Sequence, residues 1–104
     1  MKKQSRQNGW ALLTGASRGI GLELARGLSQ RGYRLVIVAR NEGQLAHARE
    51  ELLACGAEEV VALPLDLTDE GAPQRLYDEC LARGLEVEVL VNNAGMFILS
   101  LIHI

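Results

Sequence analysis

The sequence predicts an α/β protein built around a parallel β-sheet, and two observations carry that prediction. Four short apolar runs alternate with three longer segments whose apolar residues recur at helical spacing. The runs are mostly continuous rather than broken at every second residue, as is typical of strands covered on both faces. Strands that alternate with helices favour right-handed crossovers, so helices are expected on both faces of the sheet.

The expected strands are rich in valine, isoleucine and leucine, and each contains four to six residues. They are WALL at 10–13, LVIVA at 35–39, VVALPL at 60–65 and VEVLV at 87–91. Because no linker, internal repeat or low-complexity stretch separates them, the sequence predicts one domain.

Three helices are expected between these strands, each with one apolar face toward the sheet. The residues of these faces are Ile20, Leu24 and Leu28 in the first helix, Leu45, Ala48, Leu52 and Cys55 in the second, and Ala72, Leu76 and Cys80 in the third. Both cysteines are therefore expected to be small core residues rather than metal ligands or a disulfide pair.

The ends of the helices are marked by local signals. Asn41 and Gln44 resemble a capping box at the start of the second helix, and Thr68 or Asp69 is expected to cap the third. A glycine can adopt the left-handed conformation that ends a helix without strain, and one follows each helix, at Gly32, Gly56 and Gly84.

The segment TGASRGIG at 14–21 joins the first expected strand to the first expected helix. A helix N-terminus offers free backbone N–H groups and a partial positive charge, which suit a phosphate group. Gly15 permits the tight turn, Gly19 lets a pyrophosphate approach the backbone, and Gly21 lets the helix pack closely on the sheet. Thr14 and Ser17 can tie the turn or donate to phosphate oxygens. No G-K-[ST] follows, so the turn predicts phosphate binding without a P-loop.

The turn reads Thr-Gly-x-x-x-Gly-x-Gly, DLTD at 66–69 follows the third strand, and NNAG at 92–95 follows the fourth. Together these motifs resemble the short-chain dehydrogenase/reductase family over roughly residues 10–97. The resemblance implies a Rossmann-type doubly wound parallel sheet with strand order 3-2-1-4, truncated after the fourth strand. It assigns residues 1–98 to a partial NAD(P)-binding domain.

The resemblance also implies roles for individual residues. The glycine turn holds the cofactor's pyrophosphate and adenosine ribose, and Asp66 binds the adenine amino group with Leu67 beside the ring. Asn92 braces neighbouring strands and, with Ala94 and Gly95, lines the ribose and nicotinamide side. The candidate cofactor-binding residues are Gly15, Ser17, Arg18, Gly19, Ile20, Gly21, Arg40, Asp66, Leu67, Asn92, Ala94 and Gly95. Simpler alternatives are a turn or helix-cap role for Asp66 and a polar strand end for Asn92 and Asn93.

The end of the second strand bears on the choice of cofactor. A carboxylate there usually holds the ribose hydroxyls of NAD, but this sequence reads Ala39-Arg40-Asn41, with no acid before Glu42. Arg40 and Arg18 can instead bind the 2′-phosphate of NADP through their guanidinium groups. The sequence thus predicts NADP(H) rather than NAD(H), and the alternative is that both arginines are solvated surface charges.

Catalysis in this family, as the resemblance implies, depends on a Tyr-x-x-x-Lys pair and a serine. Neither Tyr33 nor Tyr77 has a lysine four residues later, and Ser100 follows NNAG too closely. No catalytic residue is predicted, and the chain alone is expected to be inactive. The tail LSLIHI at 99–104 reads like a translated transposase-type sequencing adapter, so it is expected to be non-native.

The predicted function is that of an NADP(H)-dependent oxidoreductase acting on a small-molecule carbonyl or alcohol, represented by its N-terminal part. The alternatives are a non-catalytic nucleotide-binding module and an adenosyl-cofactor methyltransferase. The net charge of −2 disfavours nucleic acid and anionic membranes as partners, and no apolar run is long enough to span a bilayer. No metal site is predicted. We expect a cytoplasmic protein whose full-length form is a homo-oligomer.

Overall fold

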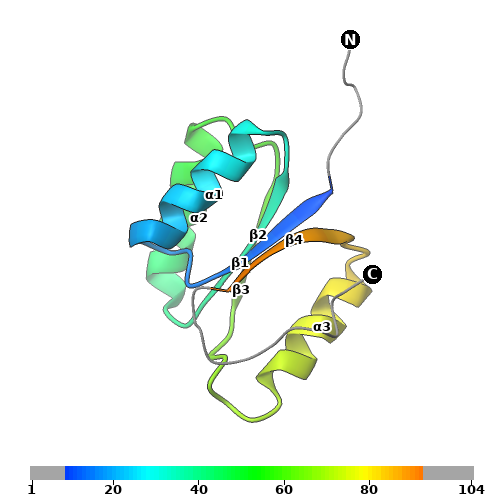
Figure 1. The fold of residues 1–104 in the computed structure, drawn as a ribbon. Coiled ribbons are helices and arrows are strands. Elements are labelled where there is room, and N and C mark those ends of the chain that lie inside the picture. The colour runs from blue at the N-terminus through cyan, green and yellow to red at the C-terminus, as the bar shows by residue number, and fades with distance from the viewer. Residues whose placement is uncertain (1–8, 93–104) are drawn as a thin grey trace.

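A computed structural model of the chain describes residues 9–92 (Figure 1). Its strands and helices alternate along the chain, as the sequence predicts. The elements are β1 (Trp10–Thr14), α1 (Gly19–Gln30), β2 (Arg34–Ala39), α2 (Glu42–Ala54), β3 (Val60–Pro64), α3 (Ala72–Ala82) and β4 (Val87–Asn92).

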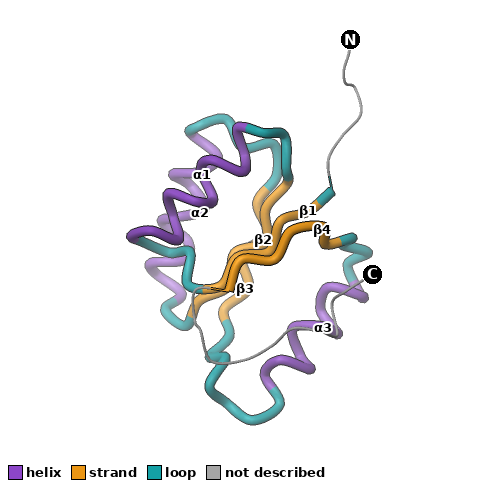
Figure 2. The backbone as a smooth tube through the Cα atoms, in the orientation of Figure 1, coloured by secondary structure: helices purple, strands orange, loops and turns teal. Residues whose placement is uncertain are grey.

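The four strands form one sheet in the order β3-β2-β1-β4, with every neighbouring pair parallel. Helices α1 and α2 cover one face of this sheet and α3 covers the other (Figures 1 and 2). The predicted fold class and strand order are therefore confirmed. Because the strands are parallel, the loops that follow them all emerge at the same edge of the sheet.

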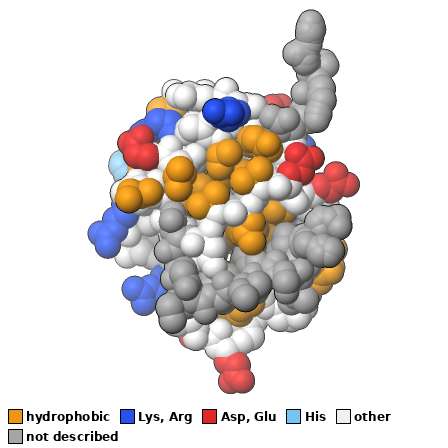
Figure 3. All heavy atoms as spheres, viewed as in Figure 1, with side chains coloured by type: hydrophobic (Ala, Val, Ile, Leu, Met, Phe, Trp, Pro, Cys, Tyr) orange, Lys and Arg blue, Asp and Glu red, His pale blue; other side chains and the backbone are white. Residues whose placement is uncertain are grey.

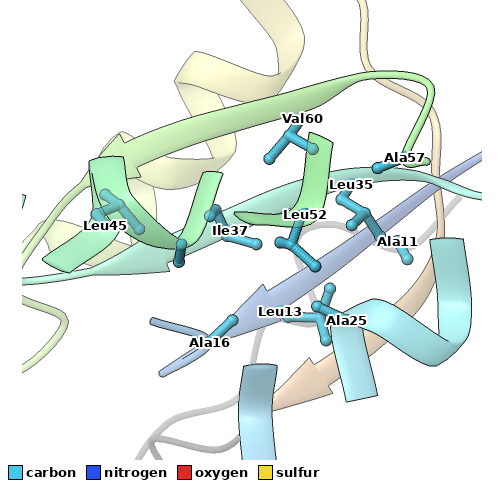
Figure 4. Close-up of a cluster of buried hydrophobic side chains, with 11 residues drawn as sticks. Ala11, Leu13, Ala16, Ala25, Leu35, Ile37, Leu45, Leu52, Ala57 and Val60 are labelled. Atoms are coloured by element: carbon cyan, nitrogen blue, oxygen red, sulfur yellow. The ribbon is translucent and has the colours of Figure 1, made fainter. Parts of the chain in front are cut away.

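The core has two layers because successive side chains of a strand point to opposite faces. Against α1 and α2 lie Ala11, Leu13, Leu35, Ile37 and Val60, and Figure 4 shows Leu45 and Leu52 of α2 reaching toward them. Against α3 lie Trp10, Leu12, Val36, Val38 and Leu63, with Leu76 and Cys80 of the helix. All five residues of β1 are buried, so its predicted coverage on both faces is confirmed.

The buried face of α1 differs from the predicted one. Ile20 is 76% exposed and Leu24 is 42% exposed, whereas Gly21 and Ala25 are buried. The predicted face was wrong at Ile20 and Leu24, whereas Leu28 packs against the core and the predicted close packing of Gly21 on the sheet is confirmed. Small residues on the inner line let the helix backbone approach the sheet closely, and the larger leucine and isoleucine side chains lie beside that line.

Cys55 is exposed, so its predicted place in the core was wrong, whereas Cys80 is buried as predicted. The reason is that α2 ends at Ala54 and Cys55 is the C-cap, beyond the last residue that follows the buried face. The predicted cap of α3 was also wrong: Gly71 occupies that position with a φ of 88°. No side chain within the described part caps α3.

Predicted burial fails at β4 and, in part, at β3, where Val61 and Ala62 are half-buried and Pro64 is exposed. Partly buried and exposed residues alternate along Val87–Asn92, rather than forming a strand covered on both faces. Within residues 9–92, β4 pairs only with β1, so it forms one edge of the described sheet. The mostly apolar run VEVLV, interrupted by Glu88, predicted a strand correctly here, but not what lies on its two faces.

Candidate cofactor-binding site

A cleft of about 730 Å³ opens where β1, β2 and β3 end. In open α/β sheets, ligands bind at this carboxyl edge of the strands. Three loops, one after each strand, supply its walls. The lining residues are Gly15, Ser17, Arg18, Val38, Ala39, Arg40, Asn41, Gln44, Leu65, Asp66, Leu67 and Thr68.

The first wall is the turn between β1 and α1. The N–H of Gly15 donates to the carbonyl oxygen of Val38 at 2.8 Å, which fastens the turn to β2. Gly15 has a φ of 67°, in the region that favours glycine. Arg18 follows in an extended conformation as the N-cap of α1, and within residues 9–92 no side chain caps this end. The first N–H groups of α1 therefore suit an anion.

Gly19 begins α1 with a φ of 64°, and a Cβ built there meets no other atom within 4 Å. The protein interior does not exclude a side chain at this position, so the backbone conformation is what requires glycine. A side chain at position 19 would project into open space beside the turn. This geometry fits the prediction that a phosphate approaches the backbone here.

The second wall is formed by the end of β2 and the start of α2. Asn41 is the N-cap of α2, and its Oδ1 accepts a hydrogen bond from the N–H of Gln44 at 2.8 Å. The predicted cap is thus confirmed. Arg40 is exposed and lines the cleft beside it. Glu42 lies in the first turn of α2 and is not among the described lining residues.

The third wall is the loop after β3. The N–H of Leu65 donates to the carbonyl oxygen of Ala39 at 3.0 Å, holding this loop beside the second wall. Asp66 Oδ1 accepts hydrogen bonds from Thr68 Oγ1 at 2.6 Å and from Thr68 N at 3.0 Å. These bonds lower the pKa of the Asp66 carboxyl, and the positive charge of Arg40 acts in the same direction. The Asp66 side chain is therefore ionised. It stabilises the turn at Thr68 and also lines the cleft.

The structure brings half of the predicted site residues into the cleft: Gly15, Ser17, Arg18, Arg40, Asp66 and Leu67. Gly19 and Ile20 lie at the start of α1 outside this lining set, and Gly21 is buried between α1 and the sheet. Asn92 joins β4 to β1, because its Oδ1 accepts a hydrogen bond from Thr14 Oγ1 at 3.0 Å. Ala94 and Gly95 lie outside the described residues.

Sequence reasoning missed six residues that line the cleft: Val38, Ala39, Asn41, Gln44, Leu65 and Thr68. A signal for most of them was present, since all but Gln44 lie within three positions of the end of an expected strand. Asn41 and Gln44 were identified only as a helix start. Their place in the cleft follows from the parallel sheet, which brings the start of α2 beside the glycine turn.

Residues 9–92 contain neither a cluster of metal ligands nor a helix that could span a membrane. No group of three or more His, Cys, Asp or Glu side chains in that range could hold a metal ion. In the same range, every helix is too short or too polar to cross a membrane.

The sequence model of the short chain dehydrogenase family matches residues 9–103, so the chain belongs to that family of Rossmann-fold oxidoreductases. Among curated relatives, it is 44% identical over 86 residues to 1-deoxy-11-beta-hydroxypentalenate dehydrogenase of Streptomyces avermitilis. That match covers 83% of this chain and 32% of the relative. The chain spans about a third of the length of the curated relatives it matches.

Solved structures give the same result. A metagenomic short-chain oxidoreductase in complex with NADP is similar with a TM-score of 0.79 and 38% identity, covering 89% of this chain and 42% of that one. The F189W actinorhodin polyketide ketoreductase with NADPH is similar with a TM-score of 0.78 and 38% identity. That match covers 86% of this chain and 34% of the ketoreductase chain.

Proposed function

We propose that this chain binds the adenosine half of NADP(H) and is the N-terminal part of an oxidoreductase acting on a carbonyl or alcohol. The observation that carries the proposal is the cleft, whose walls combine an uncapped helix start with Arg18 and Arg40. Two similar solved structures contain NADP or NADPH, which supports this choice of cofactor.

Each wall has a proposed role in binding. The start of α1 binds the pyrophosphate through its backbone N–H groups, and no side chain is needed for that contact. Arg18 and Arg40 bind the 2′-phosphate, for which their guanidinium groups are well matched. Asp66, whose carboxylate is already ionised and oriented by Thr68, accepts a hydrogen bond from the adenine amino group. When bound, the cofactor supplies or accepts the hydride.

The acid–base part of the reaction is not assigned to any described residue. Tyr33 packs against the core just before β2, so it lies at the amino ends of the strands, whereas the cleft lies at their carboxyl ends. Tyr77 lies within α3. We therefore propose that the chain by itself is inactive. The same observation favours the second candidate, a nucleotide-binding module without catalysis, and native expression at this length would support that alternative.

We also propose several features of the whole protein from the sequence and from the family resemblance. They are a small-molecule substrate, a cytoplasmic location, a homo-oligomeric full-length enzyme, and a division of this chain into residues 1–98 and a non-native tail at 99–104. An uninterrupted native reading frame that encodes the same tail would contradict the last of these.

The direct test is titration of the chain with NADPH, NADH and S-adenosylmethionine by calorimetry. NADPH is expected to bind more tightly than NADH, and Arg40→Asp is expected to reduce that preference about tenfold or more, because a charge-assisted contact with the 2′-phosphate is lost. Arg75→Asp is the matched control, since Arg75 is an exposed arginine of α3 outside the lining set. Equal affinity for both nicotinamide cofactors, unchanged by Arg40→Asp, would refute the NADP assignment, and binding of S-adenosylmethionine alone would refute the class.

The phosphate contact at α1 has its own test in Gly19→Val. Loss of NADPH binding in the full-length enzyme is expected, because the side chain projects into the space assigned to the pyrophosphate and strains a φ of 64°. Gly27→Ala is the matched control: Gly27 is exposed in the middle of α1, and a Cβ there also meets nothing within 4 Å. Full affinity in a folded Gly19→Val protein would overturn the contact.

A further inference from the structure

β3 is an edge strand, since within residues 9–92 it pairs with β2 alone. Two hydrogen bonds show which of its backbone groups face β2. The N–H of Leu35 donates to the carbonyl oxygen of Glu59 at 2.9 Å, and the N–H of Leu65 donates to the carbonyl oxygen of Ala39 at 3.0 Å. Positions 59 and 65, at the two ends of β3, therefore direct their backbone groups toward β2.

The residues between these positions form an outer edge. Successive residues of a strand direct their N–H and C=O groups to opposite sides, so the odd positions of β3 face β2 and the even positions face away from it. The outer edge of β3 consists of Val60, Ala62 and Pro64. An exposed edge of this kind is a template for the addition of another strand, such as one from a second copy of the chain.

Both ends of the outer edge of β3 are closed to such a strand. The Nε of Arg49 in α2 donates to the carbonyl oxygen of Val60 at 2.9 Å. Val60 is 3% exposed, whereas Arg49 is an exposed residue of its helix. At the other end, Pro64 has no N–H to donate. An incoming strand would therefore meet an occupied acceptor at one end and a missing donor at the other.

The packing of α2 does not by itself require the contact of Arg49 with Val60, because Leu45, Ala48 and Leu52 already bury the helix against the sheet. A charged donor makes a stronger hydrogen bond than a neutral one, so it holds the carbonyl against competition from a backbone N–H. Charged side chains and prolines are two of the features that keep natural edge strands from pairing.

We propose that Arg49 and Pro64 protect the outer edge of β3 from association with a second copy of this chain. Arg49 does so by occupying the Val60 carbonyl, and Pro64 does so by lacking a donor. The inference concerns the surface of the fold and is independent of the proposed cofactor. It implies that strand association of the isolated chain is directed to β4, at the other edge of the described sheet.

The test removes the charged donor and keeps a long, flexible side chain. Arg49→Met is made in the 104-residue chain together with Leu90→Lys, which places a charge on β4 and opposes association there. Sedimentation velocity over a concentration series is expected to show an association constant about tenfold higher than that of Leu90→Lys alone, because no charged donor then occupies the Val60 carbonyl.

Amide hydrogen exchange identifies the edge that associates. The N–H of Ala62 faces away from β2, so in Arg49→Met its exchange is expected to slow as the protein concentration rises. The N–H of Leu63 faces β2 and serves as the internal reference.

Two further variants are matched controls for Arg49→Met. Arg75→Met removes the same charge from an exposed arginine of α3 and is expected to leave association unchanged. Arg49→Lys keeps a cationic donor at position 49 and is expected to keep most of the protection.

A folded Arg49→Met chain whose association is unchanged, or in which the exchange of Ala62 is independent of concentration, would overturn the inference. An equal rise in Arg75→Met would also overturn it, because the lost charge alone would then explain the effect. Thermal melting establishes folding. If Arg49→Met unfolds, Pro64→Val decides: it restores the missing N–H and is expected to raise association about threefold, and no rise would refute the protection of this edge.

Discussion

β1 (WALLT) and β4 (VEVLVN) are neighbours in one sheet, run in the same direction and are both rich in apolar residues, although only β4 contains a charged residue, Glu88. Every residue of β1 is buried, whereas exposed and partly buried residues alternate along β4. β1 lies between two strands and carries core side chains on both faces. The comparison teaches that apolar composition predicts a strand, whereas the position of the strand in the sheet helps to decide how far it is covered.

Among residues 9–92, the exposed large hydrophobic side chains lie on β4 and on two of the helices. Leu90 of β4 is 40% exposed, and Ile20, Leu24 and Leu81 on α1 and α3 are also exposed. Figure 3 shows hydrophobic side chains gathered over α1 and the adjoining side of the sheet. An apolar edge strand with unpaired backbone groups favours association with another strand. The isolated chain is therefore predicted to be marginally stable and prone to aggregate.

The largest contrast is expected from truncating one leucine in each strand. Leu12→Ala in β1 should lower the free energy of unfolding by about 3 kcal/mol, because Leu12 is fully buried against the α3 layer. Leu90→Ala in β4 should cost less than about 1 kcal/mol. Urea denaturation measures both. Equal losses in the two variants would show that β4 is as well packed as β1.

Association through the β4 edge is tested by placing a charge on it. Leu90→Lys is expected to raise the monomeric fraction in sedimentation velocity, since a lysine on an edge strand opposes pairing with another chain. Ala46→Lys adds the same charge on the exposed side of α2 and should leave association unchanged. A parent chain that stays monomeric and melts sharply would contradict the prediction that the isolated chain is marginally stable and aggregates.

The side-chain link between the two strands should have a smaller effect. Thr14→Val removes the hydrogen bond from Thr14 Oγ1 to Asn92 Oδ1 and is expected to cost about 1 kcal/mol. A double-mutant cycle with Asn92→Ala isolates the coupling between the two side chains. Strictly additive losses would mean that the hydrogen bond does not stabilise the pairing of β1 with β4.

The smallest effect on stability is expected in the loop after β3, the edge strand opposite β4. Hydrogen bonds from Thr68 to Asp66 stabilise this loop. The Asp66 pKa is lowered in the folded chain, so this group stabilises the fold above its unfolded pKa, and that contribution is lost as the pH falls through the folded pKa. Thr68→Val should raise the Asp66 pKa toward its ordinary value, as followed by NMR titration. Thr68→Ser, which keeps the hydroxyl, should not. An unchanged pKa in Thr68→Val would rule out Thr68 as the cause.

The features that the sequence predicted correctly depend on residues close together in the chain. The order of the elements follows from apolar spacing, and the cap of α2 follows from Asn41 and Gln44, three positions apart. The glycine turn is predicted for the same reason, since a strand, a turn and a helix follow one another directly. These local rules located the first wall of the cleft and the arginine of the second.

The incorrect predictions concern which side of an element faces the core. Ile20 and Leu24 have the right helical spacing, but the closeness of α1 to the sheet selects Gly21 and Ala25 for the interior. Asp69 and Thr68 are good capping residues, but Asp66 draws Thr68 into a different turn.

By itself, the sequence determined the alternation of strands and helices, the glycine turn and the arginine after the second strand, because each is set by short-range spacing and backbone preference. Only the tertiary structure decided which faces are buried and which residues meet in the cleft. Both depend on distances between segments far apart in the chain. Asn41 shows this most clearly: its capping role is local, while its place beside Arg40 in the cleft exists only once the parallel strands are assembled.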